Sequence, residues 1–395
     1  MKGMQTAVAA VAAAATIGIS GLAQTSAPPA AASAPKTWAD KLTFKGDLRY
    51  RYESIQDDSK LDDGGDTYTR QRNRIRARLG AEAKIDDQMK AGLELSTGQS
   101  DPVSGNQSLG DGFGKKEFRL NLAYADYNLL RDGPHAAHAI GGKMKNPFIT
   151  LPDDLVWDGD LTPEGLAFKG KLDGGFVTLL ANGGYLWVQE RSAEDDAMLY
   201  AGQAAAEFQL KPELGLTLGA AYYGFEHFKG YDVIDWEKKN NAYGNSTVAG
   251  SVSGGATNKA WASDFAPLVF FARLDARAFG QPIALFTQQL SNDDADSLGD
   301  GHLYGFSLGK AKNPRTWEVG YSYAELEKDA TPGLMTDSDR WGGGSDGKGH
   351  RVYGKVQVLS YLQAGVTYLM GEKAISDSAK TKDYDRLQVD LVASF

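Results

Sequence analysis

Residues 42–53 have the sequence LTFKGDLRYRYE, and apolar and polar side chains alternate along them. Apolar, aromatic or glycine residues occupy the even positions from Leu42 to Tyr52, and polar or charged residues occupy the odd positions from Thr43 to Glu53. Successive side chains of a β-strand point to opposite faces, so this period of two predicts a strand with one apolar face and one charged face.

The same alternation returns along the chain as far as its last residue, Phe395. In the fourth expected strand the apolar positions change from even to odd numbers between Leu122 and Ala123, which predicts a β-bulge. We expect sixteen strands, near residues 42–56, 70–85, 89–97, 116–130, 137–145, 165–172, 176–188, 198–210, 215–225, 267–277, 282–290, 302–311, 316–327, 350–358, 362–370 and 384–395.

The connections between the expected strands fall into two length classes. The short ones include residues 173–175, 211–214, 278–281, 312–315 and 359–361, and the long polar ones are 57–69, 98–115, 146–164, 226–266, 291–301, 328–349 and 371–383. Short turns on one side and long loops on the other are typical of outer-membrane barrels. We therefore predict an all-β fold, a transmembrane antiparallel up-and-down β-barrel of about sixteen strands with short periplasmic turns and long extracellular loops.

The physical requirements of a membrane agree with this prediction. Lipid offers no hydrogen bonds to a backbone, so a sheet that crosses it has to close on itself. We expect the apolar face to contact outer-membrane lipid and lipopolysaccharide, and the charged face to line the lumen. Sixteen strands enclose more space than their side chains fill, which leaves a water-filled channel. A soluble β-sandwich, the alternative, would rarely place its long loops on one side.

The composition limits the chemistry that the chain can perform. Charged residues are 24% of the 395 residues, the formal net charge is −9, and cysteine is absent. The lack of cysteine excludes disulfides, thiolate metal sites and c-type haem attachment. The acidic balance argues against nucleic acid as a partner, and we expect no cofactor.

The first residues have the features of an export signal. Lys2 carries a positive charge, residues 7–22 are small and apolar, and a small-x-small motif precedes Gln24. We expect a cleaved signal peptide at residues 1–23, an Ala/Pro-rich spacer at 24–40, and an outer-membrane barrel at 41–395 with an inserted loop at 146–164. An uncleaved N-terminal anchor is the alternative. Export would carry the chain through the periplasm to the bacterial outer membrane.

Six stretches in a fixed order give the chain a family resemblance. They are Phe44–Arg51, Arg70–Arg78, Ala123–Tyr127, Gly142–Phe148, Leu155–Asp158 and Leu161–Gly165. The chain resembles the putative-porin family of Gram-negative outer membranes over nearly all of its expected mature length. The resemblance implies a channel for small solutes, and likeness to sixteen-stranded porins implies a homotrimer. The last strand, which ends in Phe395, resembles the signal read by the outer-membrane assembly machinery.

Arginine occupies alternate positions of the second expected strand and recurs on the first. These residues are Arg70, Arg72, Arg74, Arg76 and Arg78 on the second strand, and Arg49 and Arg51 on the first. Residues on one face are roughly 7 Å apart along a strand, so Arg72 to Arg78 would form a ladder ~20 Å long. A lumen ladder of permanent charges attracts anions. We therefore predict that all of these arginines except Arg70 line the pore, with pairing to acidic neighbours for stiffness as the alternative.

The loop at residues 146–164 occupies the position that folds into the barrel in sixteen-stranded porins. Pro147, Phe148 and Trp157 are suited to anchor it. Its acidic residues are Asp153, Asp154, Asp158, Asp160 and Glu164, and Lys143 and Lys145, which precede it, are expected to face the lumen. An acidic loop opposite an arginine wall would create a transverse electric field. The alternative is an ordinary extracellular loop.

Enzyme motifs are weak. Gly305–Gly309 matches the serine-hydrolase elbow formally, but that elbow needs a strand-to-helix turn and this segment lies inside an expected strand. We therefore predict a channel for passive diffusion of small hydrophilic solutes and no enzyme activity. A barrel that acts as an adhesin or interaction platform, through loops such as 226–266, is the alternative. Stable conductance steps in a planar bilayer would distinguish the two.

Overall fold

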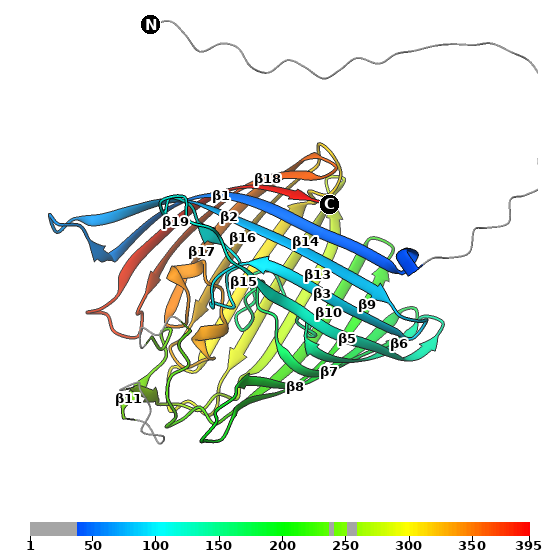
Figure 1. Ribbon diagram of the computed structural model, residues 1–395, viewed down its shortest axis with the longest axis horizontal. Helices are drawn as coiled ribbons and strands as arrows, with labels where there is room; N and C mark the ends of the chain where they lie inside the picture. The colour runs from blue at the N-terminus through cyan, green and yellow to red at the C-terminus, as the bar shows by residue number, and fades with distance from the viewer. Residues whose placement is uncertain (1–37, 237–240, 251–258) are drawn as a thin grey trace, which may run out of the picture. The chain divides into compact units, whose positions relative to one another are not determined.

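The computed structural model of the chain describes residues 38–236, 241–250 and 259–395 (Figure 1). The predicted signal peptide and most of the predicted spacer lie outside the described residues. Every strand in the described part of the chain lies in one compact unit, Asp40–Phe395. No helix in the described part of the chain is long and apolar enough to cross a membrane.

Within the described residues, sixteen strands form one antiparallel sheet (Figure 1). They are β1 (Leu42–Leu61), β2 (Thr67–Lys84), β3 (Met89–Thr97), β5 (Phe118–Asp132), β6 (His135–Lys143), β7 (Glu164–Asp173), β8 (Val177–Gln189), β9 (Ala197–Lys211), β10 (Leu214–Glu226), β13 (Leu268–Ala278), β14 (Gln281–Ser291), β15 (Asp300–Gly309), β16 (Trp317–Leu326), β17 (Gly347–Leu359), β18 (Leu362–Lys373) and β19 (Lys382–Ser394). The predicted all-β barrel is confirmed, and so is its number of strands.

Shorter elements complete the fold. The two-residue β4 (Gln107–Ser108) pairs with β2, and β11 (Thr247–Ala249) pairs with β12 (Lys259–Trp261) in a separate two-stranded sheet. Three 3₁₀ helices are also described: η1 (Trp38–Lys41), η2 (Gly333–Met335) and η3 (Arg340–Gly342). The last two lie in the long β16–β17 loop, which becomes important for the lumen.

The first and last strands close the sheet into a barrel. β1 pairs with β2 on one side and with β19 on the other, in a register that runs from Asp47 opposite Ser394 to Asp57 opposite Tyr384. Beyond the last residue of β19, the backbones of Gly46 and Phe395 exchange two hydrogen bonds of 3.0 Å. Closure leaves no sheet edge without partners, as a membrane requires.

Alternation along β1 sorts its side chains as predicted. Leu48 and Tyr50 are 52% and 44% exposed on the outer face, whereas Arg51 and Glu53 are buried inside. The predicted bulge in the fourth barrel strand, β5, is also confirmed. Glu94 and Leu95 are adjacent on β3, but their partners on β5 are Leu122 and Leu120, which leaves one extra residue between them.

The expectation that the inner face is charged is wrong for half of the wall. Strands β8–β10 and β13–β16 turn buried apolar side chains inward near their long-loop ends, and loop residues cover them. This core includes Leu199, Tyr223, Phe225, Val269, Phe271, Phe286, Leu290, Leu303 and Leu326 from strands, and Phe228, Trp261, Phe265, Leu334 and Trp341 from loops. The reason is that long loops pack inward, and an apolar wall lets them bury surface there. Charge is concentrated on the opposite wall.

Candidate channel constriction

The loop between β6 and β7, residues 144–163, crosses the lumen; we call it the inner loop. Its Asp154 accepts a hydrogen bond of 2.9 Å from Gln288 on β14, and its Asp153 accepts one from Ser322 on β16. Its Asp160 forms a 3.1 Å ion pair with Arg76 on β2. Because β14, β16 and β2 belong to different sides of the barrel, the loop that contacts all three lies within it.

Three aromatic rings fix the apolar side of the inner loop. Phe148 and Trp157 stack with ring centroids 5.7 Å apart, and Tyr223 of β10 meets their edges at 5.4 and 5.7 Å. Such pairs add about 0.5–1.5 kcal/mol each beyond the apolar area that they bury. The loop therefore packs against the apolar wall and turns its polar residues toward β1 and β2.

Two of the predicted acidic residues hold the loop in place. Asp154 accepts hydrogen bonds from the backbone N–H groups of Leu151, Val156 and Trp157, as well as from Gln288, and burial raises its pKa. Asp153 is only 3% exposed at its side chain and forms ion pairs with Arg340, at 3.2 Å, and with Arg351. Both carboxyls are consumed by these contacts rather than presented to water.

Asp158 ties the inner loop to the β16–β17 loop (residues 327–346). Its carboxylate accepts hydrogen bonds from the backbone N–H groups of Asp160, at 2.7 Å, and Ser338, at 2.9 Å. Its own N–H donates to the carbonyl of Met335 at 2.8 Å. Burial, reinforced by repulsion from Asp337 and Asp160, raises its pKa well above the ordinary carboxyl value. Burial likewise raises the pKa of Asp337.

Opposite the inner loop stands an arginine wall built by β1 and β2. It consists of Arg49, Arg51, Arg72, Arg74, Arg76 and Arg78. The register places Arg49 beside Arg76 and Arg51 beside Arg74, so like charges meet across the two strands. Carboxylates stabilise this crowding at both ends: Glu53 lies 2.6 Å from Arg72, and Asp47 bridges Arg76 and Arg78 at 3.0 and 2.7 Å.

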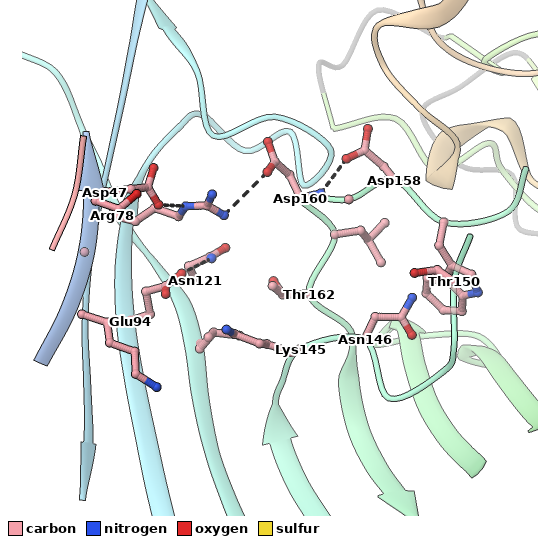
Figure 2. A pocket seen from close by; sticks show the side chains of 17 residues that line it. Asp47, Arg78, Glu94, Asn121, Lys145, Asn146, Thr150, Asp158, Asp160 and Thr162 are labelled. Atoms are coloured by element: carbon pink, nitrogen blue, oxygen red, sulfur yellow. Dashed lines mark hydrogen bonds and ion pairs between the residues drawn. The ribbon is translucent and has the colours of Figure 1, made fainter. Parts of the chain in front are cut away.

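Asp160 is where the inner loop meets the arginine wall. One carboxylate oxygen lies 3.1 Å from Arg76 and 3.7 Å from Arg78. Figure 2 shows the contact with Arg78. Three cavities of about 380, 470 and 500 Å³ surround this contact, and Asp160 lines all of them. Figure 2 shows the 470 Å³ cavity, with Asp47 and Arg78 on the barrel side and Thr150 and Asn146 on the side of the loop. The contact is therefore the candidate constriction of the lumen.

Arg49 differs from its neighbours in the arginine wall. It donates a 2.6 Å hydrogen bond to the side-chain oxygen of Asn106, but it forms no ion pair with any described carboxylate. Its Nε is buried and has no hydrogen-bond partner within the described residues. It lines the 380 Å³ cavity. One guanidinium beside the constriction thus keeps its charge unneutralised by a direct partner.

The remaining predicted residues lie at the margins. Lys143 contacts the carbonyl of Thr162 at 3.0 Å and Glu164 at 2.9 Å, and both Lys143 and Glu164 line the 500 Å³ cavity. Lys145 lines the 470 Å³ cavity. Phe395 lies at the closing seam, with its side chain exposed, and it lines none of the three cavities.

Sequence reasoning missed several charged partners of this region. They are Arg340, Arg351, Arg386, Asp337, Asp339 and Asp390. Alternation along β17 and β19 marks Arg351 and Arg386 as inward positions and would have found them. Asp337, Asp339 and Arg340 sit in an irregular loop, where no periodic signal exists.

Comparison with known proteins agrees with this architecture. The sequence of residues 64–242 matches the family described as putative porin. This segment is therefore similar to that family, and the fold of the chain is that of an outer-membrane β-barrel. A search of curated proteins gives no match to the chain.

Solved structures share the fold of this chain at low sequence identity. OprB of Pseudomonas putida, in its high-pH structure, superposes with a TM-score of 0.57 at 12% identity, over 90% of this chain and 95% of that one. A loop L8 deletion mutant of OmpT of Vibrio cholerae gives a TM-score of 0.50 at 12% identity, over 90% of this chain and 99% of that one. At such identities the likeness shows the fold alone.

Proposed function

We propose that this porin forms a water-filled channel for passive diffusion of small hydrophilic solutes and prefers anions. The observation that carries the preference is the arginine wall facing the constriction, with Arg49 unpaired beside it. The acidic residues across the lumen offset this wall incompletely, because Asp153 is paired with two arginines of its own and Asp154 is buried under hydrogen bonds.

Net charge points the other way, since the chain as a whole carries −9. Permeating ions, however, respond to charges within about one Debye length, roughly 8–10 Å at ordinary ionic strength. Acidic residues in distant loops are therefore screened from the constriction. Local charge at the arginine wall is expected to dominate.

Replacing Arg74, Arg76 and Arg78 with Gln is expected to shift the reversal potential in a salt gradient toward cations. The substitution removes three positive charges from the wall while it keeps polar side chains there. The shift should shrink as salt rises, because the Debye length falls from about 30 Å at 0.01 M to about 10 Å at 0.1 M. Single-channel recording in planar bilayers measures both conductance and reversal potential.

A matched control removes the same charge far from the lumen. Lys211, Arg277 and Lys312 lie at strand ends and turns on the short-turn side, and replacing them with Gln should leave the reversal potential nearly unchanged. Equal shifts from both triple variants would show that total charge, rather than the arginine wall, sets selectivity. Absence of stable conductance steps in the parent protein would contradict the channel itself.

Selectivity is also expected to depend on pH through Asp158 and Asp337. Because both pKa values are raised, these carboxyls take up protons as pH falls, before ordinary carboxyls do. Loss of their negative charge beside the constriction should move the reversal potential toward anion preference. The shift should occur at pH values above those at which ordinary carboxyls take up protons. Charges that face Asp337 are those of Arg340, Arg351, Asp153 and Asp339. In Asp337→Asn the shift should be smaller; an unchanged pH profile would remove this pair from the conduction path.

The interaction-platform alternative receives less support from the loops. Phe228, Val233, Ile234, Trp261 and Phe265, all from the β10–β13 loop, are buried in the core inside the barrel. A loop that packs its aromatic residues inward presents less of itself to a partner outside the cell.

Three further parts of the proposal rest on resemblance. We infer cleavage after Ala23, insertion into lipid and lipopolysaccharide by the outer-membrane assembly machinery, and assembly as a homotrimer. Mass spectrometry of the purified protein tests the cleavage site. Chemical cross-linking of intact membranes tests the trimer, and a ladder that stops at monomer would contradict it.

A further inference from the structure

Asp160 differs from the other acidic residues of the inner loop in how it is held. Its side chain is 22% exposed, whereas that of Asp153 is 3% exposed and Asp154 is fully enclosed by hydrogen bonds. It is also the carboxylate that lines all three cavities around the constriction. A solute in any of these cavities therefore meets Asp160.

The ion pairs of Asp160 are weaker than those of the neighbouring Asp47. Asp47 offers one oxygen to Arg76 and the other to Arg78, at 3.0 and 2.7 Å. Asp160 offers a single oxygen to both arginines, at 3.1 and 3.7 Å, and its other oxygen accepts only a long 3.4 Å bond from the N–H of Gly105. Carboxylates held through two oxygens by guanidinium groups bind more strongly than those held through one. Asp160 is thus the exchangeable partner of these arginines.

Arg49 is an arginine beside this contact that has no carboxylate partner among the described residues. It pairs directly with Arg76 in the β1–β2 register, yet it contacts no described carboxylate. Its Nε is buried without a hydrogen-bond partner among the described residues. Arg49 and Asp160 line the same 380 Å³ cavity. Arg76 and Arg78 line the 500 Å³ cavity instead, and Asp160 is the residue that lines both cavities.

We propose that Arg49, Arg76 and Arg78 form a binding site for the carboxylate of an organic solute, and that Asp160 is a tethered competitor which the solute displaces. The inference rests on the proposed channel function and adds the substrate class. A carboxylate is assigned because the group that now occupies the site is one, and a guanidinium fork matches its geometry. The exchange is reversible and forms no covalent bond.

A tethered competitor has a consequence for transport. Conduction requires a site that binds strongly enough to attract the solute and weakly enough to release it. Asp160 returns to Arg76 and Arg78 whenever the solute carboxylate moves away, so it lowers the apparent affinity and speeds release. Without the Asp160 carboxylate, the arginines should bind the solute more tightly and release it more slowly.

The test is block of chloride current by succinate in planar bilayers. Asp160→Asn should lower the half-blocking concentration of succinate roughly tenfold, or about 1.4 kcal/mol. Arg49→Gln should raise that concentration, because it removes the unpaired guanidinium. A half-blocking concentration that rises in Asp160→Asn, or stays the same in both variants, would overturn the proposal.

Glu94→Gln is the matched control. Glu94 lines the same 470 Å³ cavity as Asp160 and hydrogen-bonds to Asn121, but it forms no ion pair with a described arginine. If Glu94→Gln lowers the half-blocking concentration of succinate as much as Asp160→Asn does, the effect comes from lumen charge in general, and the competitor role of Asp160 is overturned. Inorganic phosphate is the second probe. If Asp160→Asn lowers the half-blocking concentration of succinate alone, the carboxylate assignment is supported. An equal decrease in the half-blocking concentration of phosphate overturns it.

Reversal potentials recorded on the same channels separate this inference from the proposed anion preference. A parent channel that prefers cations would contradict the preference. Succinate block that tightens in Asp160→Asn would still support the binding site. Heat-modifiable mobility on gels shows that each variant has folded, independently of its conductance.

Discussion

Replacing Glu53 with Ala is expected to lower the free energy of unfolding by roughly 3–5 kcal/mol, the range for removing one partner of a buried charge network. The side chain of Glu53 is 0% exposed. Its carboxylate lies 2.6 Å from both Arg72 and Arg386, and at 3.5 and 3.6 Å it also contacts Arg51 and Arg74. Without it, four guanidinium groups would face one another with too few carboxylates between them.

The position of Glu53 on the closing seam makes this loss affect the whole barrel. Glu53 is on β1, Arg72 is on β2 and Arg386 is on β19, so one carboxylate joins the first two strands to the last. Repulsion among the arginines would act directly on the β1–β19 pairing. Denaturant unfolding in detergent micelles, followed by tryptophan fluorescence, measures the change.

Glu82→Ala provides the comparison on the neighbouring strand. Glu82 is 34% exposed at its side chain and contacts Tyr124 at 3.0 Å and Lys90 at 3.7 Å. A partly exposed pair contributes about 0–1 kcal/mol, so its loss should be small. Similar unfolding midpoints for the two variants would mean that Glu53 is not the centre of the seam.

The strands were predictable because a barrel wall imposes period two on its sequence. The alternation from Leu42 to Glu53 is sufficient to predict a membrane-spanning strand, because one face is apolar enough for lipid and the other is charged. The β5 bulge is also visible in the sequence, because one extra residue in the strand shifts the apolar positions from even to odd numbers after Leu122. A local pattern of this kind needs no knowledge of distant contacts.

The inner face of β13 shows where that pattern fails. Val269 and Phe271 face inward, and Leu268 and Phe270 face outward, so the run Leu268–Phe271 is apolar on both sides. Only the inward-packed loops explain why an apolar residue is stable at an inner position. Whether a long loop packs inside or extends outside is decided by contacts between residues far apart in the chain.

The constriction was predictable in its residue types but not in its pairings. Alternation placed the arginines of β1 and β2 on one face, and the structure has them there. The partner of Asp153, however, is Arg351, 198 positions away, and no local signal connects them. Tight ion pairs bury some acidic residues and leave Asp160 partly exposed, and this difference in accessibility comes from tertiary packing alone.

Deletion of Phe395 is expected to reduce the amount of folded barrel in the outer membrane to a small fraction of the parent level. The deletion removes both backbone hydrogen bonds to Gly46 at the end of the seam, each worth about 0.5–1.5 kcal/mol. It also removes an outward aromatic ring, and transfer of such a side chain from water contributes roughly 1.5–3 kcal/mol. Heat-modifiable mobility on gels, together with immunoblots of outer-membrane fractions, measures the folded amount.

The ring and the backbone make separable contributions at this end of the seam. Phe395→Tyr keeps the aromatic ring and the chain length, so it should fold nearly as well as the parent, whereas Phe395→Ala should be intermediate. Gly46→Ala probes the same contact from the other side, because a Cβ there would lie 2.5 Å from a ring atom of Phe395 and 2.7 Å from the carbonyl oxygen of Arg78. Channels that do form from the deletion variant should conduct normally, since Phe395 is exposed and lines none of the three cavities. Parent levels of folded protein after the deletion would show that neither the ring nor the two hydrogen bonds govern closure.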